Sequence, residues 1–167
     1  ELGYPGGPAI SAQAQDFLER GGSAHEDISL PRPMIDSPGY DMSFSGLKTS
    51  LLYALKKDPE WRERIPQYCY EFQQAIIDVL SSKTVKAARE YNAQSIMLGG
   101  GVAANHKLRS DLSRYIRERS TNLSFMVPDM AYTTDNAAMI ASAGYFHAPS
   151  TDTPSWGKVE VDCNWRL

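Results

Sequence analysis

The chain has 167 residues, 42% of them hydrophobic and 22% charged, with a formal net charge of −3 at pH 7. This composition is that of an ordinary globular protein, and the net charge gives no overall attraction to nucleic acid or to a membrane surface. No stretch approaches the roughly 20 consecutive apolar residues of a membrane span, and the two cysteines, Cys69 and Cys163, stand in no cluster that suggests a disulfide framework or a zinc site.

The N-terminal part of the chain alternates between turn signals and helical patterns. Residues 4–8 (YPGGP) are a turn cluster, and residues 9–20 are expected to form a helix. Residues 21–40 are rich in Gly, Pro, Ser and Asp and are expected to form a loop. A second helix follows, with Ser45 as its expected N-cap.

The middle of the chain is predicted to supply a helical layer. Asp58-Pro59 should begin a short helix that Pro66 interrupts, and the longest periodic segment follows at 67–91. One face of that helix is expected to be buried, because its apolar residues recur every three or four positions. The residues of this face are Cys69, Phe72, Ile76, Leu80, Thr84, Ala87 and Tyr91.

The last part of the chain is predicted to form two strand–loop–helix units. The expected elements are a strand at 95–98, a helix at 105–119, a strand at 123–127 and a final helix capped by Thr133 or Thr134. Strands joined in this way run parallel with right-handed crossovers, so the predicted class is α/β. Residues 150–167 form a separate tail, in which the alternation at 156–167 suits a terminal strand.

A run of glycines at 99–101 separates the first strand from its helix. With Ala104 it matches the dinucleotide-binding pattern G-x-G-x-x-G/A, and glycine there allows a positive φ and a close backbone approach to a phosphate. The alternative is a turn that needs glycine for geometry alone, and nothing downstream completes a Rossmann domain. Asn105 stands at the expected N-cap, where its amide would cap the helix or reach a ribose or a base.

The segment 133–136 (TTDN) is a second candidate, because it follows a strand and opens a helix. Asp135 would either complement the helix dipole or serve as a carboxylate ligand for a metal. A lone carboxylate cannot hold a transition metal, and the three histidines, which show no i,i+4 spacing, complete no ligand set. These residues therefore predict no whole metal site.

Two further patterns each allow a purely structural and a functional interpretation. Gly6 and Gly7 precede the first helix, where their N–H groups would form an anion-binding nest or merely a turn. In the helix at 105–119 acidic residues interrupt the basic ones, which favours a solvated face over RNA contact. No Ser/His/Asp, Cys/His or G-x-S-x-G nucleophile pattern occurs, so the chain alone looks incomplete as an enzyme.

Four segments, in this order, are similar to one family. YPGGPAIS, SLPRPMIDSPGYDMSFSGLKTSL, IMLGGGVAANHKLR and YTTDNAAMIASAG resemble the C-terminal half of the tRNA threonylcarbamoyladenosine transferase family TsaD, formerly Gcp or O-sialoglycoprotein endopeptidase. The resemblance covers nearly the whole chain and weakens after Pro149. Four ordered motifs are more specific than any single glycine pattern.

The resemblance implies an actin-like ATPase fold with two lobes and a nucleotide cleft, residues 1–149 being the C-terminal lobe. It implies transfer of a threonylcarbamoyl group from threonylcarbamoyl-AMP to the adenosine 3′ of the anticodon in tRNAs reading ANN codons. ATP or the adenylate would be the nucleotide ligand, with one divalent metal, iron or zinc. By motif, Gly7 and Asn105 match nucleotide- or substrate-binding residues of the family, and Asp135 matches a metal ligand. The implied partners are tRNA, threonylcarbamoyl-AMP and other subunits of a cytoplasmic threonylcarbamoylation complex.

Part of the family's site is expected to lie outside this chain. The paired histidines of the family, an H-x-x-x-H pattern, belong to its N-terminal half, and no such pattern occurs here. The chain is interpreted as one lobe of a two-lobed enzyme, inactive alone, with weak or absent ATP binding, no stoichiometric metal and an exposed lobe interface that favours self-association. A stand-alone nucleotide- or phosphate-binding module is the alternative. The metallopeptidase of the old family name is disfavoured, since no peptidase motif is present.

Overall fold

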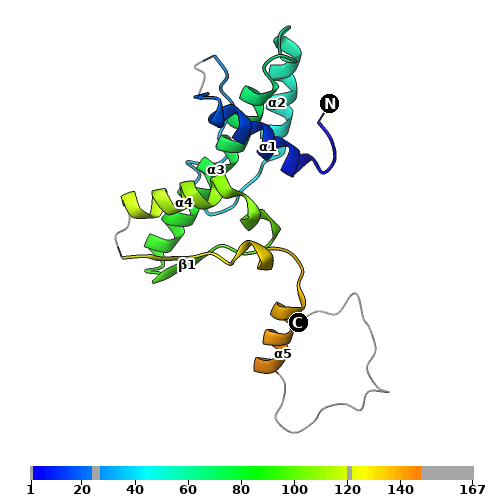
Figure 1. The fold of residues 1–167 in the computed structure, drawn as a ribbon. Coiled ribbons are helices and arrows are strands. Elements are labelled where there is room, and N and C mark those ends of the chain that lie inside the picture. Colours follow the sequence, from blue (N-terminus) through cyan, green and yellow to red (C-terminus); the bar gives the residue numbers. More distant parts are fainter. Residues whose placement is uncertain (1, 24–26, 120–121, 148–167) are drawn as a thin grey trace.

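The computed structural model describes residues 2–23, 27–119 and 122–147, which form an α/β fold dominated by helices. In chain order (Figure 1) the elements are α1 (Gly6–Glu19), α2 (Ser45–Lys57), α3 (Ile65–Glu90), β1 (Ser95–Met97), η1 (Gly101–Ala104), α4 (His106–Arg119), β2 (Ser124–Met126), η2 (Met130–Tyr132) and α5 (Ala137–His147), where η denotes a 3₁₀ helix. The predicted tail at 150–167, with its strand, lies outside the described residues.

Helix α3 is the centre of the fold, and α1, α2, α4 and β1 all pack against it (Figure 1). Its buried residues therefore lie on several sides rather than along one stripe. The predicted buried face is confirmed only in part: Cys69 is buried, the residues of this face from Phe72 to Ala87 are half-buried, and Tyr91 is 73% exposed. A helix surrounded by neighbours also buries polar side chains, and Gln73 and Lys83 are among them.

Two apolar clusters hold α2, α4 and β1 against α3. The spacing of apolar residues in α4 predicts that Leu108, Leu112, Tyr115 and Ile116 face inward. The three aliphatic residues are between 2% and 3% exposed, which confirms this face, while Tyr115 is half-buried. Each buried side chain of this size stabilises the fold by about 1.5–3 kcal/mol. One cluster joins α3, α4 and β1 through Val85, Ala88, Ile96, Leu112 and Ile116, and the other joins α2, α3 and the preceding loop through Leu30, Leu47 and Ala75.

Strands β1 and β2 form a two-stranded parallel sheet. In its register Ser95 pairs with Ser124, Ile96 with Phe125 and Met97 with Met126. The chain passes from β1 through η1 and α4 to β2, as parallel strands require a crossover of this kind. The predicted α/β class, with parallel strands and a helical layer, is confirmed, while the actin-like lobe remains a prediction.

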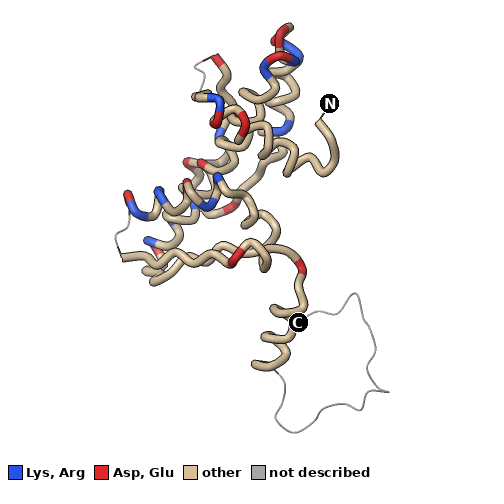
Figure 2. Tube along the Cα trace, in the orientation of Figure 1, with Lys and Arg blue, Asp and Glu red and all other residues tan. Residues whose placement is uncertain are grey.

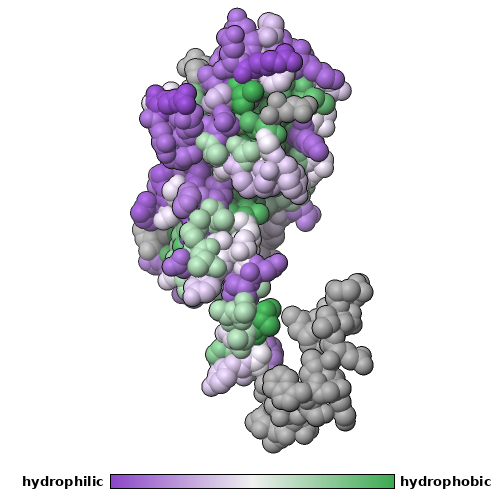
Figure 3. All heavy atoms as spheres, turned by 45° about the vertical axis from the view of Figure 1, so that its right-hand side comes forward, coloured by the Kyte–Doolittle hydropathy of each residue, from purple (hydrophilic) through white to green (hydrophobic). Residues whose placement is uncertain are grey.

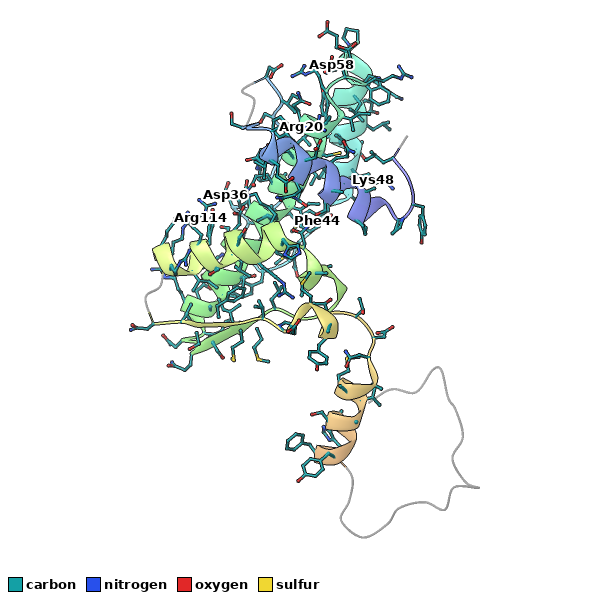
Figure 4. All side chains as sticks on the ribbon, viewed as in Figure 1. Arg20, Asp36, Phe44, Lys48, Asp58 and Arg114 are labelled. Atoms are coloured by element: carbon teal, nitrogen blue, oxygen red, sulfur yellow. The ribbon has the colours of Figure 1, made fainter. Side chains whose placement is uncertain are left out.

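Several helix starts differ from the predicted ones. α1 begins at Gly6, before the predicted start at residue 9. Phe44 and not Ser45 is the N-cap of α2, and Lys48 is exposed near the start of that helix (Figure 4). Turns replace the short helix predicted after Asp58-Pro59, and Pro66 lies in the first turn of α3 instead of interrupting a helix. Proline suits that position because the first N–H groups of a helix have no acceptor there.

The loop before α2 is tied to α3 by an ion-pair network. Arg32 pairs with Glu71 and, through Nη2, with Asp78 Oδ2 at 2.9 Å. Leu30 N–H donates to Glu71 Oε1 at 2.9 Å, so the carboxylate holds both the side chain and the backbone of the loop. Burial lowers the pKa of Arg32, but its hydrogen bonds to Glu71 and Asp78 outweigh that effect and raise it.

Helix α5 stands apart from the other helices (Figures 1 and 3). Its residues are exposed, with Ile140 at 66% and Phe146 at 78%. Apolar side chains lie on all its sides, a pattern usual for buried helices. Between β2 and the end of α5 the only Asp, Glu, Lys or Arg residues are Asp129 and Asp135 (Figure 2). In the part of the chain that the structure describes, no helix is both long and apolar enough to cross a membrane.

Candidate functional site

A mostly apolar groove of about 760 Å³ lies between α1 on one side and η1 with the start of α4 on the other, with a side chain of α3 also lining it. This volume is in the range of about 300–1,000 Å³ that is usual for small-molecule sites. Two of the three predicted site residues, Gly7 and Asn105, line it together, and Asp135 does not. The lining residues that carry the argument are Gly7, Ser11, Gln73, Gly101, Asn105 and Lys107.

Gly7 lies in the first turn of α1, on one wall of the groove. No side chain caps this helix, whose first backbone bond runs from Ala9 N–H to Pro5 O at 3.3 Å. The N–H groups of Gly6 and Gly7 therefore have no acceptor within the helix. No atom outside the helix lies within 4 Å of a Cβ placed on Gly7, so this end is open. Free N–H groups at the positive end of a helix dipole suit an anionic group such as a phosphate.

The glycine run forms the opposite wall. Gly100 has φ +76°, in the left-handed region, which confirms the predicted positive φ in this run. Ala103 N–H donates to Gly100 O at 2.9 Å and closes the first turn of η1. Arg109 in α4 donates through Nε to Ala103 O and so fixes η1 against the helix that follows. The turn thereby presents Gly101 to the groove.

Asn105 joins η1 to α4, and its carboxamide is almost fully engaged. Its Oδ1 accepts a hydrogen bond from Leu108 N–H at 2.9 Å, which confirms the predicted N-cap. Its Nδ2 donates to Gln73 Oε1 at 2.8 Å and to Ser11 Oγ at 2.9 Å. Both N–H groups of the amide are therefore used, and the second lone pair of Oδ1 is what remains for a ligand.

Ser11 and Gln73 are site residues that the sequence analysis does not single out, although Ser11 ends the motif YPGGPAIS. Ser11 Oγ donates to Gln73 Oε1 at 2.5 Å, so that both side chains and Asn105 form one hydrogen-bonded triangle. Gln73 is only 8% exposed within α3. Gln73 lies four positions after Cys69 and four before Ile77, and both of these residues are buried. That spacing places its amide on a buried side of the helix, where an amide needs a hydrogen-bond partner.

The charged residues near the groove are less solvated than predicted. Lys107 Nζ pairs with Asp111 Oδ2 at 2.5 Å, and Asp111 is buried. The predicted solvated face of α4 is therefore wrong for Lys107 and for Arg109, whose guanidinium is engaged with η1. Arg114, Arg117 and Arg119 are exposed, as predicted.

A second, smaller cavity of about 150 Å³ lies between α1, α2 and α3 and is lined almost wholly by apolar side chains. Cys69 borders this cavity, and burial raises the pKa of its thiol to about 11. The thiol is therefore protonated at neutral pH, whereas thiol nucleophiles react as thiolates. Cys69 gives no support for covalent catalysis.

Asp135 lies between η2 and α5, with an exposed side chain. The predicted caps of the last helix are wrong: Asn136 Oδ1 accepts from Met139 N–H at 2.9 Å, while Thr133 Oγ1 donates back to Met130 O. Asp135 therefore precedes the helix instead of lying in its first turn. Within residues 2–23, 27–119 and 122–147, no three His, Cys, Asp or Glu side chains lie close enough together to hold a metal ion.

A groove walled by a helix start and a glycine turn is typical of a ligand-binding α/β unit. The family model for tRNA N6-adenosine threonylcarbamoyltransferase, TsaD, matches residues 1–142. A curated protein of that name from Thermosipho africanus is 42% identical over 146 residues, which cover 86% of this chain and 41% of the relative. The chain belongs to the tRNA N6-adenosine threonylcarbamoyltransferase family, as its motifs predicted.

Other relatives have the same name, and they too match this chain over less than half of their own length. A protein from Caldicellulosiruptor saccharolyticus is 42% identical over 157 residues, covering 93% of this chain and 44% of the relative. One from Nitrosospira multiformis is 39% identical over a 171-residue alignment, covering 99% and 47%. Both are named tRNA N6-adenosine threonylcarbamoyltransferase. The chain thus spans less than half the length of these relatives.

Proposed function

We propose that this chain supplies the C-terminal lobe, residues 1–149, of a two-lobed tRNA threonylcarbamoyltransferase with an actin-like fold. In this acyltransferase the threonylcarbamoyl group passes from threonylcarbamoyl-AMP to the adenosine 3′ of the anticodon in tRNAs reading ANN codons. Membership of the family supports the reaction class. The observation that carries the proposal is that Gly7 and Asn105, from motifs far apart in the sequence, line one groove of suitable volume.

Within the groove, each wall has its own proposed task. The free N–H groups at the start of α1, including that of Gly7, would bind a phosphate oxygen of ATP or of the adenylate. Asn105 would accept a hydrogen bond from a ribose hydroxyl through the free lone pair of Oδ1. Because Ser11 and Gln73 hold the Asn105 amide, this acceptor is positioned before the ligand arrives.

The described residues do not by themselves fit a metal. Iron and zinc sites need about three protein ligands, and Asp135 is a single exposed carboxylate. We assign Asp135 as the ligand that this chain contributes and derive no chemical step through the metal. The remaining ligands would come from outside the chain.

The exposed apolar surface of α5 supports a further lobe in the whole protein. A helix that is apolar on all sides is ordinarily covered, and in this chain it is exposed. We propose that α5 is covered by the N-terminal lobe of the whole protein. When this chain is alone, we expect it to self-associate through the exposed surface of α5. The proposed partners of the whole cytoplasmic protein are tRNA and the other subunits of the threonylcarbamoylation complex.

The proposal is tested with the whole protein, incubated with threonylcarbamoyl-AMP and an ANN-reading tRNA. Mass spectrometry of the digested tRNA should detect the modified adenosine. Asn105→Ala should lower the initial rate at least about tenfold, because both the ligand contact and the cap are lost. Asn122→Ala, at an exposed turn outside the groove, serves as the control and should retain the rate. If the protein binds nucleotide but produces no modified adenosine, the transferase assignment is wrong and the chain is better described as a stand-alone nucleotide-binding module.

A further inference from the structure

The hydrogen bonds beside the groove fix the orientation of the Gln73 amide step by step. Leu108 N–H can only donate, so Asn105 must turn its oxygen toward it. The Nδ2 of Asn105, which can only donate, then faces Gln73, and the Gln73 atom that meets it at 2.8 Å must be the oxygen. Ser11 Oγ donates to the same oxygen. Gln73 Nε2 is the opposite end of this anchored amide.

Gln73 Nε2 has no hydrogen-bond acceptor among the residues that the structure describes, although the side chain is more than nine-tenths buried. It is not one of the fully enclosed polar atoms without a partner, so it keeps some access to solvent, and Gln73 lines the groove. The next residue differs: Gln74 Nε2 donates to Asp78 at 2.9 Å and to Asp111 at 3.2 Å, and Gln74 does not line the groove. The unpartnered donor of Gln73 thus belongs to the groove.

We propose that Gln73 is a ligand-contact residue whose Nε2 donates a hydrogen bond to a neutral acceptor on the nucleoside part of the bound nucleotide, a ribose hydroxyl oxygen or a purine nitrogen. The inference rests on the nucleotide assigned to the groove under the proposed function. The donor that suits a phosphate, the N–H group of Gly7, belongs to a different wall, at the start of α1. Gln73 instead offers an uncharged donor in a mostly apolar groove.

The anchoring of Gln73 makes this contact selective. Turning the amide by 180° would bring Nε2 against Asn105 Nδ2, which can only donate, and would forfeit both hydrogen bonds to Oε1. Gln73 therefore cannot exchange its donor for an acceptor to suit a different ligand. A ligand that presents a donor here would leave two donors face to face, which disfavours it.

Gln73→Glu separates the contact from the scaffold. The glutamate keeps an oxygen for Ser11 and Asn105 but replaces the Nε2 donor with a second acceptor. In the whole protein at pH 8.5, where a carboxyl that accepts two hydrogen bonds is ionised, calorimetry should show adenosine and AMP binding about tenfold more weakly. The melting temperature should fall, because the new carboxylate is buried, and inorganic phosphate should lose affinity through charge repulsion alone. Because adenosine is uncharged, its weaker binding reports the lost hydrogen bond instead of this repulsion. Gln94→Glu makes the same charge change at an exposed position outside the groove and should leave all affinities intact.

Adenosine affinity equal to wild type in folded Gln73→Glu would overturn the contact while leaving the nucleotide site in place. Failure of the wild-type whole protein to bind adenosine or AMP would overturn the proposed function and this inference together. Should Gln73→Glu not fold, the Gln73 side-chain NH2 signals of the ¹⁵N-labelled wild-type protein should shift on adding adenosine, and unshifted signals in a saturated complex would overturn the contact. Among ligands, 2′- and 3′-deoxyadenosine test the ribose oxygens and 7-deazaadenosine tests a purine nitrogen. The analogue that lacks the atom contacted by Gln73 Nε2 should bind the wild-type protein and Gln73→Glu with equal affinity.

Discussion

Gly100 turns the chain from β1 into η1 through a φ of +76°, and this turn brings Gly101 and Asn105 to the groove. No atom lies within 4 Å of a Cβ placed on Gly100, so backbone conformation rather than lack of space requires glycine. Gly99 has equally open surroundings but no positive φ. Comparing substitutions at Gly99 and Gly100 therefore tests whether glycine is needed for its backbone conformation, because space is available at both positions.

Gly100→Ala should lower the free energy of unfolding by about 1–3 kcal/mol, because the combination of φ +76° and ψ 179° is open almost only to glycine. Gly99→Ala should change it by less than about 0.5 kcal/mol, the usual effect of a surface substitution. Urea denaturation of both variants beside the wild-type chain provides the measurement. Equal losses in the two variants would contradict the conformational explanation.

Cys69 should resist alkylation in the folded chain. Burial raises its thiol pKa from 9.0 to about 11, so at pH 8 the thiolate population falls by a factor of about 100. Iodoacetamide labelling, followed by mass spectrometry of the peptide that contains Cys69, should be at least that much slower in buffer than in urea.

The same shift makes stability depend on pH in the alkaline range. Because the folded pKa lies above the unfolded one, the contribution of the buried neutral thiol is complete below pH 9 and declines as the pH rises toward 11. In Cys69→Ala this part of the decline should be absent. In the alkylation experiment, fast labelling of the native chain at pH 8 would contradict both predictions, because it would show that the Cys69 thiol is accessible and ionised.

At the scale of elements, α3 organises the fold because it meets a neighbour on nearly every side. The loop before α2 is attached to it at several points. Arg32 pairs with Glu71 and Asp78, and farther along α3 Lys83, only 1% exposed, donates to Ser37 Oγ at 2.7 Å and to Gly39 O at 2.8 Å. A loop without regular structure thereby becomes a fixed part of the core.

Arg32→Ala should destabilise the chain strongly. Its removal leaves Glu71, which is buried, without a cationic partner, and breaking such buried pairs costs about 3–5 kcal/mol. Arg32 is itself partly exposed, so we expect a value of about 3 kcal/mol. Arg62→Ala, at an exposed arginine stacked on Trp61, is the matched control and should cost less than about 1 kcal/mol. Thermal melting of both variants would test this, and a small loss for Arg32→Ala would show that the loop is held by apolar contacts alone.

At the scale of the whole molecule, the chain brings Gly7 and Asn105 together but leaves Asp135 and α5 exposed. It also spans less than half the length of its relatives. Under the proposed function these facts have one explanation, since a cleft between lobes needs both lobes for its walls and its metal ligands.

Asp135→Ala in the whole protein should remove the metal and the transferase activity together, because a site with few protein ligands does not survive the loss of one. Elemental analysis after gel filtration would measure the metal. Asp129→Ala removes the other carboxylate of this segment, which is also exposed, and should keep the metal bound. This chain alone should hold no stoichiometric metal. Tight retention of metal by it would contradict the division of the site between two lobes.

Local chemistry explains which features were predictable. The N-cap role of Asn105 and the positive φ in the glycine run follow from neighbouring residues, and the structure confirms both. The cap of α5 was assigned to Thr133 or Thr134 but belongs to Asn136, because these side chains have similar capping ability and the exact start of a helix is set by the preceding turn. Tyr91 fits the apolar period of α3 and is nevertheless exposed, since it lies beyond the last turn of the helix.

The sequence by itself determined the family, the α/β class with parallel strands, and two residues of the groove, because motif order, hydrophobic period and capping chemistry are all local in the chain. Only the tertiary structure decided that α3 is buried on several sides and that Ser11, Gln73 and Asn105 meet in one hydrogen-bonded triangle. The partners of Gln73 are distant in sequence, and a polar residue in a helix shows no local sign of what will cover it. Which end of its amide is left for a ligand follows from the donors and acceptors that the fold places around it.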